Sequence, residues 1–359
     1  MAGSRRDFLQ TAVVGAALAA VDVAPTGTTR AAESRRIRIG QIGTAHAHAT
    51  KLSAYRDSSD YEVVGIVEPD PALRRAAESQ SVYQGLPWMT QEELLRTTGL
   101  QAVLVETRVQ DLIATAQACV DAGMHVHVDK PAGDSLPKLE RLLDAARSRK
   151  LMVQMGYMYR YNPGIVLLRK FLKEGWLGDV FEVHAVMSKV VPPQDRTRLA
   201  EFPGGMMFEL GCHLLDLVVG LFGEPQSVRS FARHSSSLKD GLVDNMLAVL
   251  DYPRMLATVK TTALEVEGGA RRHLVVCGTE GTFQIQPLDN PSIQLTLSRP
   301  QGEFKKGTQT IPLPKYVRYI DDAADMARVI RSEKPTDFPY EHDLAVERTL
   351  LAACGLSVG

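Results

Sequence analysis

The sequence predicts an α/β protein in which a doubly wound parallel sheet is followed by an α+β domain with a large, open, mainly antiparallel sheet. Strand-like and helix-like segments alternate up to about residue 150, whereas the later part has successive strand-like segments without intervening helices. The 359 residues, 45% of them hydrophobic, suffice for about two domains with sizeable cores.

The first 34 residues are predicted to be a signal peptide and linker. Adjacent arginines, Arg5 and Arg6, precede a short alanine-rich apolar run, which is the layout of an export signal. The segment Ser-Arg-Arg-Asp-Phe-Leu is similar to a bacterial twin-arginine signal, which is recognised by an export receptor and does not anchor the protein in the membrane. We therefore expect a periplasmic protein, or one otherwise exported through the twin-arginine route, without a membrane anchor. The other interpretation is a frayed amphipathic terminus.

Residues 35–154 are predicted to form the parallel sheet. Short apolar or β-branched runs there are typical of buried strands: Ile37–Ile42, Glu62–Val67, Ala102–Glu106 and His125–Val128. Helical patterns lie between them, at Pro71–Ser79, Glu92–Thr97 and Leu112–Ala122. Because ligands bind outside the carboxyl ends of such strands, Asp129 and Lys130 are well placed for a site.

Residues 155–359 are predicted to form the second domain. One helix opens at Asn162-Pro163 and another lies around Met206–Leu221. Alternating strand-like segments follow: Val228–Arg233, Met246–Leu250, Leu256–Thr262, His273–Cys277, Thr282–Gln286 and Ile293–Leu297. The chain ends in helices Ile320–Ser332 and Asp343–Ala353, of which the last could pack back on the first domain. An open sheet face commonly packs against a copy of itself, so we expect a homo-oligomer, a dimer or a tetramer.

Charge and cysteine content favour small-molecule chemistry. The formal net charge of −1 provides no strong field for nucleic acid or an anionic membrane surface, so neither is expected as a partner. The four cysteines show no CxxC or metal spacing, and we expect free buried thiols: Cys119, Cys212, Cys277 and Cys354.

The loop after the first strand is a weakened dinucleotide-binding fingerprint. The pattern G-x-G-x-x-G places Gly43 first, Ala45 second and His48 third, with Thr44 and His46 in the same cofactor-binding loop. Glu68 ends the next strand, where a carboxylate accepts hydrogen bonds from the ribose hydroxyls and repels a 2′-phosphate. The sequence therefore predicts a Rossmann domain that binds NAD in preference to NADP. Glu68 as an ordinary strand-end carboxylate is the alternative.

His46 and His48 raise the alternative of a metal site. If a helix begins at Ala45, residues two apart point about 200° from each other, which disfavours a shared ion. We predict no metal, and expect one imidazole to line the cofactor or substrate cleft while the other packs.

Six segments occur in this order: IRIGQIGTAHAH, EVVGIVEPD, AGMHVHVDKP, MVQMGYMYRYNPGI, GGMMFELGCHLLDLVVGLFG and CGTEGTF. Together they resemble the Gfo/Idh/MocA oxidoreductase family, the glucose-fructose oxidoreductase and inositol dehydrogenase group. The resemblance covers nearly everything after Arg35.

The resemblance implies particular site residues. The family's Glu-Lys-Pro is here Asp129-Lys130-Pro131, which places the lysine near the nicotinamide and the substrate hydroxyl. The family's Asp-x-Gly-x-His-x-x-Asp is here Glu209 to Asp216, with His213 as its histidine and a glutamate in place of the first aspartate. The usual Thr-Pro-Asn at the cofactor is here Thr107-Arg108-Val109.

The chemistry of these residues points the same way. Glu209 and His213 are four apart, so a helix would put them on one face, with Asp216 a turn beyond, and the carboxylate could orient the imidazole as a base. Lys130 in a desolvated cleft would have a depressed pKa and could exchange a proton with the substrate oxygen. A surface lysine, a core histidine, or a strained metal site on this helix face are the alternatives.

The segment GYMYRYNP offers a substrate surface. Tyr157, Arg160 and Asn162, together with Asp216, supply donors, acceptors and a flat ring suited to a sugar or polyol. Aromatic residues that alternate along a strand are equally typical of a core, whereas a guanidinium is costly to bury without a partner.

These observations predict an exported NAD(P)-dependent oxidoreductase that acts on a sugar, polyol or sugar derivative by hydride transfer. The alternative is a redox-neutral glycosidase or lyase in which tightly bound NAD stores the hydride transiently, which suits a compartment with little free nicotinamide. A non-catalytic sugar-binding relative would leave Lys130 and His213 without a role.

Overall fold

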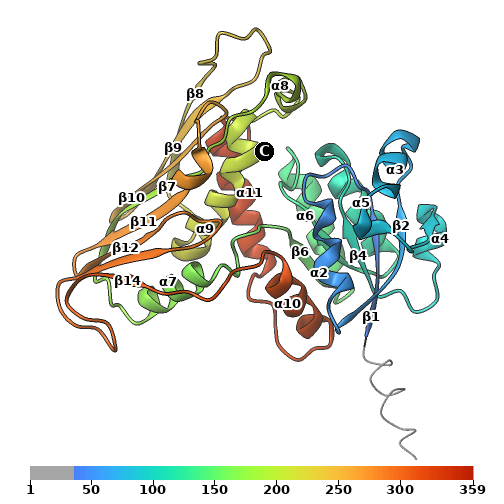
Figure 1. Cartoon of the computed structure of the whole chain (residues 1–359), viewed down its shortest axis with the longest axis horizontal. Helices are drawn as coiled ribbons and strands as arrows, with labels where there is room; N and C mark the ends of the chain where they lie inside the picture. Colours follow the sequence, from blue (N-terminus) through green and yellow to red (C-terminus); the bar gives the residue numbers. More distant parts are fainter. Residues whose placement is uncertain (1–35, 359) are drawn as a thin grey trace, which may run out of the picture. The chain divides into compact units, whose positions relative to one another are not determined.

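The computed structural model describes residues 36–358, and the chain from Ile37 onward forms one compact unit. It contains one parallel and one mainly antiparallel sheet, each with helices, so the predicted α/β fold class is confirmed (Figure 1). The predicted signal segment lies outside the described residues. Within the described part, no helix combines the length and apolar character needed to cross a bilayer.

The first sheet has six parallel strands in the order β3-β2-β1-β4-β5-β6. Their bounds are β1 Ile37–Ile42, β2 Tyr61–Val67, β3 Trp88–Met89, β4 Ala102–Val105, β5 His125–Val128 and β6 Val153–Met155. All four residues of β4 are buried, as expected for a strand covered on both faces. The strand order reverses between β1 and β4, and ligands of Rossmann folds bind at this reversal.

Five α-helices of this half connect or flank the strands: α2 Leu52–Arg56, α3 Pro71–Glu78, α4 Gln91–Leu95, α5 Val109–Asp121 and α6 Leu136–Ser148. Asp70 caps α3 by accepting hydrogen bonds from the backbone of Ala72 and Leu73. No helix begins at Ala45, which was the condition for the angle argued between His46 and His48, because the first helical turn, a 3₁₀ turn, starts only at Ala49.

The second sheet has eight strands in the order β14-β13-β12-β11-β7-β10-β9-β8, all pairs being antiparallel except β7 with β10. Their bounds are β7 Val180–Val186, β8 Ser227–Arg233, β9 Asn245–Tyr252, β10 Met255–Thr262, β11 His273–Gly278, β12 Gly281–Ile285, β13 Ile293–Leu297 and β14 Gly307–Ile311. Strands β7 and β14 were not among the predicted segments.

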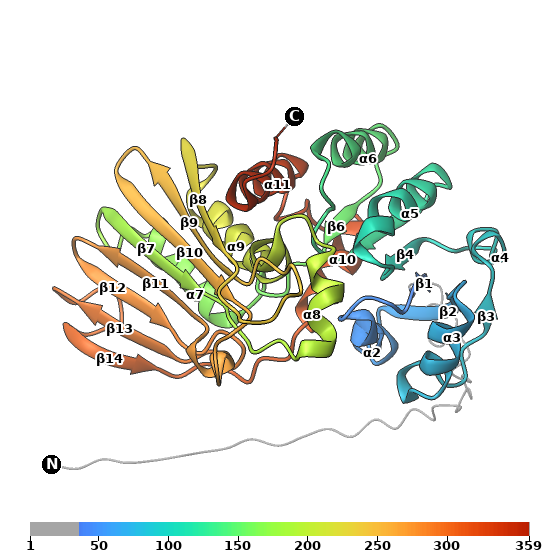
Figure 2. The ribbon, with the colours of Figure 1, turned by 90° about the horizontal axis from the view of Figure 1, so that it is seen from above.

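Helices cover one face of the second sheet (Figures 1 and 2). The helices of this half are α7 Pro163–Lys173, α8 Pro193–Ala200, α9 Cys212–Phe222, α10 Ile320–Ile330 and α11 Tyr340–Cys354. In the part of the chain that the structure describes, no helix lies over the other face of this sheet. Helix α10 contacts α2 and α11 contacts α6, so the chain returns to the helices of the first sheet.

A five-residue π-helix, Met207–Gly211, precedes α9. The sequence predicted one continuous helix over Met206–Leu221, and this expectation is corrected because a π-turn changes the angular spacing of side chains. None of the four cysteines forms a disulfide within residues 36–358, and Cys277 and Cys354 are only partly buried.

Candidate active site

Gly43 forms the cradle at the end of β1. Its φ of +94° belongs to a region that side chains rarely adopt, and a Cβ there would lie 2.6 Å from the backbone of Glu106 and Thr107. The backbone of this loop therefore passes directly against the end of β4. Gly43 thus makes the tight turn that the fingerprint assigns to its first glycine.

Glu68 closes the same loop at the end of β2. The backbone N–H and hydroxyl of Thr44 donate to Glu68 Oε2 at 2.7 and 2.8 Å, and the Asp70 N–H donates to Oε1 at 3.0 Å. A cavity of about 850 Å³ opens beside them, lined among others by Gly43, Ala45, Glu68, Trp88, Thr107 and Arg108. Of the predicted cofactor residues, Gly43, Ala45, Glu68 and Thr107 line this cavity, whereas Thr44 and His46 do not.

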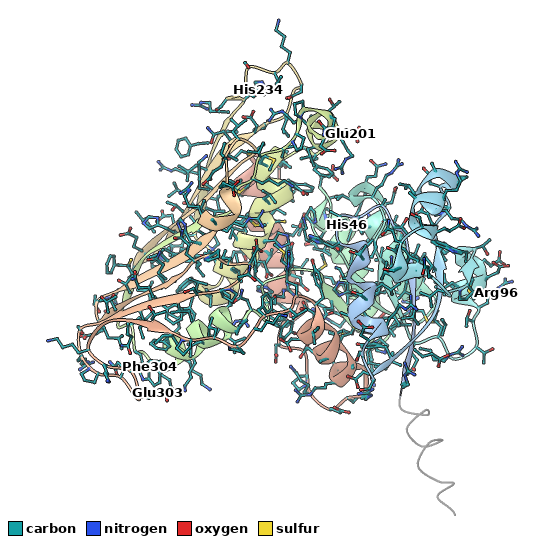
Figure 3. The ribbon with its side chains drawn as sticks, in the orientation of Figure 1. His46, Arg96, Glu201, His234, Glu303 and Phe304 are labelled. Carbon is teal, nitrogen blue, oxygen red and sulfur yellow. The ribbon has the colours of Figure 1, made fainter. Side chains whose placement is uncertain are left out.

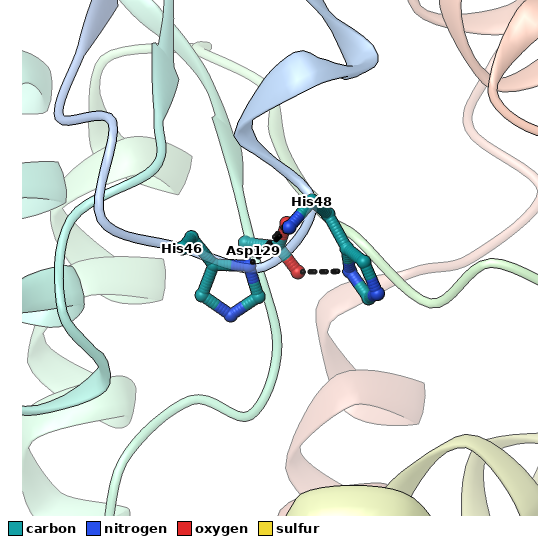
Figure 4. A group of neighbouring side chains, drawn as sticks. All are labelled: His46, His48 and Asp129. Atoms are coloured by element: carbon teal, nitrogen blue, oxygen red, sulfur yellow. Dashed lines mark hydrogen bonds and ion pairs between the residues drawn. The ribbon is translucent and has the colours of Figure 1, made fainter. Parts of the chain in front are cut away.

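Asp129 accepts hydrogen bonds from several directions at the end of β5. Lys51 Nζ donates to Oδ2 and the Lys130 N–H donates to Oδ1, both at 2.7 Å. The Nδ1 atoms of His46 and His48 lie 3.0 and 3.3 Å from its two oxygens (Figure 4). Burial alone raises the pKa of Asp129, but these neighbours outweigh it and hold the pKa well below its ordinary value.

The two histidines therefore converge, contrary to the expectation that they point apart. Both precede the first helical turn, so the helical angle between them does not apply. With Asp129 they bring three possible ligand atoms within 4.8 Å of one another. Lys51 already provides a positive charge at the same carboxylate, which opposes the binding of a divalent cation there.

Lys51, on the 3₁₀ turn before α2, was missed by the sequence analysis. It is 3% exposed, and its Nζ lies 3.2 Å from Glu106 Oε1 and 2.9 Å from His127 Nε2. Burial and the charge of Asp129 raise the pKa of Glu106, while burial and Lys51 lower the pKa of His127 to about 3. The shortest ion pair of this buried set joins Lys51 Nζ to Asp129 Oδ2 at 2.7 Å.

Lys130 lies under the π-helix. Its Nζ donates to the backbone carbonyl of Glu209 at 3.0 Å and lies 3.6 Å from Glu209 Oε2, and the residue is only 2% exposed. The expected depression of its pKa is wrong: burial lowers the pKa of Lys130, but the surrounding acidic groups, Glu209 first among them, outweigh burial and raise it. The ammonium form is therefore stabilised.

Glu209 pairs with lysines and not with His213. Its Oε1 lies 3.6 Å from Lys189 Nζ, and its Oε2 faces Lys130. The predicted pairing required four residues of regular α-helix, whereas the π-helix ends between Glu209 and His213 and alters their relative direction.

His213 is buried, and its Nδ1 atom has no hydrogen-bond partner. Its ring lies about 6 Å, centroid to centroid, from the rings of His48, Tyr157 and Tyr159. Burial, followed by the charge of Lys130, holds the pKa of His213 well below its ordinary value, so its imidazole is neutral. A neutral imidazole can accept a proton.

Arg160 and Asp216, predicted to bind substrate, form a buried ion pair instead of lining a cavity. Arg160 Nη2 donates to Asp216 Oδ1 at 2.7 Å and to Asp343 Oδ1 at 2.6 Å, and His342 Nε2 lies 3.0 Å from Asp216. Both side chains are about 2% exposed. The Arg160 guanidinium is thus paired with carboxylates of α9 and α11, two helices that are distant from it in the sequence.

Tyr157 and Asn162 also occupy interior positions. Asn162 caps α7 by accepting from the backbone of Gly164 and Ile165, and it donates to the Leu288 carbonyl. Tyr157 is 2% exposed, and its ring lies edge-on to the imidazole of His213.

A cleft of about 1050 Å³ continues from the cofactor cavity, with Ala45, Thr107 and Arg108 lining both. It is bounded by the loop after β1, the segment after Lys130, the segment around α8, and Glu209 of the π-helix. His46 and Glu201, two of its lining residues, are labelled in Figure 3. The sequence analysis also missed Lys189 at this cleft, although it follows the alternating pattern of β7.

Family models match both halves of the chain. The model described as "Oxidoreductase family, NAD-binding Rossmann fold" matches residues 37–157, and the "GFO/IDH/MocA C-terminal domain" matches residues 165–284. The chain belongs to the Gfo/Idh/MocA oxidoreductase family. The resemblance stated from the sequence is confirmed in this respect.

Several curated proteins and solved structures are similar to this chain over most of its length. Trans-1,2-dihydrobenzene-1,2-diol dehydrogenase of Bos taurus is 26% identical over 281 residues, 77% of this chain and 79% of its own. The WlbA dehydrogenase from Bordetella pertussis, solved with NADH and UDP-GlcNAcA, has a TM-score of 0.72 at 18% identity, covering 89% and 95% of the two chains. UDP-N-acetylglucosamine 3-dehydrogenase from Acidithiobacillus ferrooxidans has a TM-score of 0.73 at 19% identity, covering 90% and 98%.

Family membership makes this chain an oxidoreductase with an NAD-binding Rossmann domain. The loop fits a nicotinamide cofactor, because Gly43 makes the tight turn after β1 that no side chain would allow, and both Gly43 and Glu68 line the cavity at the ends of β1 and β2.

Proposed function

We propose that this protein oxidises a hydroxyl-bearing carbon of a sugar, polyol or sugar derivative with NAD as the oxidant. The observation that carries the proposal is the position of Lys130, a buried ammonium held by Glu209, which itself lines the cleft that continues from the cofactor cavity. The sugar class is supported by similar dehydrogenases whose names include sugar nucleotides. The preference for NAD rests on Glu68, since its carboxylate repels a 2′-phosphate.

The residues divide the chemistry between a cation and a base. Oxidation of an alcohol removes a hydride from carbon and a proton from oxygen, and NAD, when bound, supplies the hydride acceptor. Lys130 donates a hydrogen bond to the substrate oxygen and stabilises the negative charge that develops there. His213, whose Nδ1 has no hydrogen-bond partner, accepts the hydroxyl proton, and the negative charge that develops at the substrate would offset the effect of burial on its imidazolium form.

Turnover and cofactor content test this proposal together. We expect the purified protein to reduce added NAD with at least one member of a panel of hexoses, pentoses and polyols, and to use NADP less well. Denaturation of the protein as isolated shows whether NAD(H) is resident. Stoichiometric NAD(H) with no net reduction of added NAD would favour the redox-neutral glycosidase or lyase. If the protein contained no resident cofactor and showed no turnover, the non-catalytic sugar-binding protein would be favoured.

Export through the twin-arginine route is part of the proposal. It rests on Arg5 and Arg6 before the short apolar run. Replacing both with lysine keeps the charge but removes the paired guanidinium groups, so the precursor should accumulate, folded, in the cytoplasm. Normal export of this double variant would contradict the twin-arginine assignment.

Self-association through the second sheet also belongs to the proposal. Strand β10 alternates buried residues with outward ones, and outward Leu256 and Phe231 of β8 are 54% and 50% exposed. Apolar residues on an uncovered sheet face favour an isologous contact between two copies. Light scattering should show a dimer or tetramer, and Leu256→Lys should shift it toward monomer. A monomeric wild type at all concentrations would contradict this part.

A further inference from the structure

Lys189 extends an apolar row of the second sheet into the cleft. The inward residues Val183 and Ala185 of β7, and Met187 just after it, are at most 2% exposed. The next residue of the same parity is Lys189, which is in the wall of the cleft and has its Nζ 3.6 Å from Glu209 Oε1. A cation therefore stands where the inner face of the sheet meets the site.

Arg272 occupies the corresponding place beside the neighbouring strand. Leu274 and Val276 are the inward residues of β11, both 0% exposed, and Arg272 precedes them with the same parity. Since β11 pairs His273 with Val186, Arg272 lies at the end of the sheet that carries Lys189. Its Nη1 donates to Asp289 Oδ2 at 2.8 Å, while its buried Nε has no hydrogen-bond partner.

Cations outnumber carboxylates at this end of the sheet. Within residues 36–358, Glu209 pairs with Lys130 and Lys189, and Asp289 pairs with Arg272 and, at 4.0 Å, with Arg318. Four positive side chains thus share two carboxylates, and of these six residues Lys189 and Glu209 line the cleft, while Asp129 also acts on Lys130. Tyr159 donates to Asp289 at 2.8 Å, so that carboxylate is already fully engaged.

Among the residues that line the cleft, Lys189 and Glu209 form one pair of opposite charge, so the additional positive charge at this end comes from Lys130, Arg272 and Arg318 behind the wall. The other fully charged lining residues of the cleft balance, three against three: Arg108, Lys138, Arg198, Asp134, Asp195 and Glu201. An anionic group entering the cleft is therefore attracted to the Lys189 end and not to the walls in general.

We propose that the substrate is a sugar acid whose carboxylate binds Lys189 at the end of the second sheet, beside Arg272. This inference rests on the proposed function and names its substrate class. Lys189 sets specificity and takes no part in proton transfer, which belongs to Lys130 and His213. A carboxylate there would occupy the surplus positive field that Glu209 and Asp289 leave uncompensated.

The environment of Lys189 agrees with this role. Burial lowers the pKa of Lys189, and the charges of Lys130 and Arg272 lower it further, while Glu209 alone acts strongly in the opposite direction. A bound carboxylate would relieve this unfavourable crowding of cations, whereas a neutral hydroxyl would not.

The experiment measures binding of matched acidic and neutral ligands by titration calorimetry. The NADH-saturated full-length protein is titrated at low ionic strength with D-glucuronate against D-glucose, D-galacturonate against D-galactose, and D-gluconate against D-glucitol. In at least one pair we expect the acid to bind roughly ten- to hundredfold more tightly, the range of a charge-assisted hydrogen bond. Lys189→Met should abolish that preference and leave the neutral ligand within about twofold.

Two further variants control for charge and folding. Lys189→Arg should retain most of the preference for the acid, and Lys173→Met, the same change at an exposed position of α7, should leave both affinities unchanged. Thermal unfolding checks that Lys189→Met folds. The inference is overturned if no acid binds more tightly than its neutral partner, or if Lys189→Met weakens both ligands of a pair equally.

Turnover assays on the same ligands separate this inference from the proposed function. Acids that bind through Lys189 without reducing NAD would contradict the oxidoreductase assignment and leave the anion site intact. Reduction of NAD with the neutral sugars only, at equal affinity for the acids, would overturn the anion site and leave the oxidoreductase intact.

Discussion

The two sheets contribute to the site in different ways. In the parallel sheet, β1, β2 and β5 all end at one edge, so Gly43, Glu68 and Asp129 meet simply because each follows a strand. In the second sheet most neighbours are antiparallel, and Lys189 follows its strand whereas Arg272 precedes its own. A position next to a strand therefore indicates a site residue in the first half but not in the second.

Lys130→Met is expected to have the largest effect and tests whether chemistry depends on the parallel half. The substitution removes the ammonium and nearly keeps the volume of the side chain, so turnover should fall by about 10²- to 10⁴-fold while NAD affinity and folding persist. Steady-state kinetics, NAD titration and thermal unfolding measure the three quantities. Near-normal turnover on a substrate of the wild type would remove Lys130 from the catalytic assignment.

Arg160→Met tests whether the buried charged residues of the second half stabilise the fold and do not bind substrate. Its loss leaves Asp216 and Asp343 buried and less compensated, which should cost about 3–5 kcal/mol of unfolding free energy. Denaturant unfolding measures this cost. A variant with wild-type stability but a raised KM would restore Arg160 to the substrate surface that the sequence predicted.

Glu68→Ala concerns cofactor choice in the parallel half. Loss of a carboxylate that accepts from a ribose should weaken NAD binding by about 1.5–3 kcal/mol and reduce the bias against NADP. Fluorescence titration with both cofactors measures the change. If the affinities for NAD and NADP were both unaltered, Glu68 would have only its loop contacts with Thr44 and Asp70.

Glu347, on α11, gives an effect on stability that depends on pH and is small only at low pH. Neither of its carboxylate oxygens has a hydrogen-bond partner, and burial raises its pKa to about 8. Because the folded state binds this proton more tightly than the unfolded chain, the stabilisation is complete below the ordinary carboxyl pKa and is lost as pH rises toward 8. Relative to wild type, Glu347→Gln should gain stability between pH 5 and pH 8.

Thermal unfolding at both pH values measures the effect of Glu347→Gln. We expect Glu347→Gln to have a higher Tm than wild type, by about 2–4 °C for each kcal/mol of stabilisation. This difference in Tm should be larger at pH 8 than at pH 5. A difference between variant and wild type that is the same at both pH values would mean that the Glu347 carboxyl does not titrate in this range.

Local patterns were sufficient for the parallel sheet, except the two-residue strand β3, and for the residues that follow its strands. The apolar runs, Gly43 and the acidic end of β2 are near-neighbour features, and a parallel sheet places strand ends at one edge whatever the details of packing. The family's lysine was recognisable for the same reason, since Lys130 directly follows β5.

Only the tertiary structure decided which charged side chains face the cleft and which pair in the interior. Arg160 forms a hydrogen bond with Asp343, 183 residues away, and Lys51 forms one with Asp129, 78 residues away. No local pattern could therefore show that the Arg160 and Lys51 side chains are buried. The π-helix turned Glu209 from His213 toward Lys130 and Lys189, a change of direction that residue spacing does not reveal. Sequence alone determined which strands form the cofactor edge, because that depends on local periodicity; the partners of each charge depended on long-range packing.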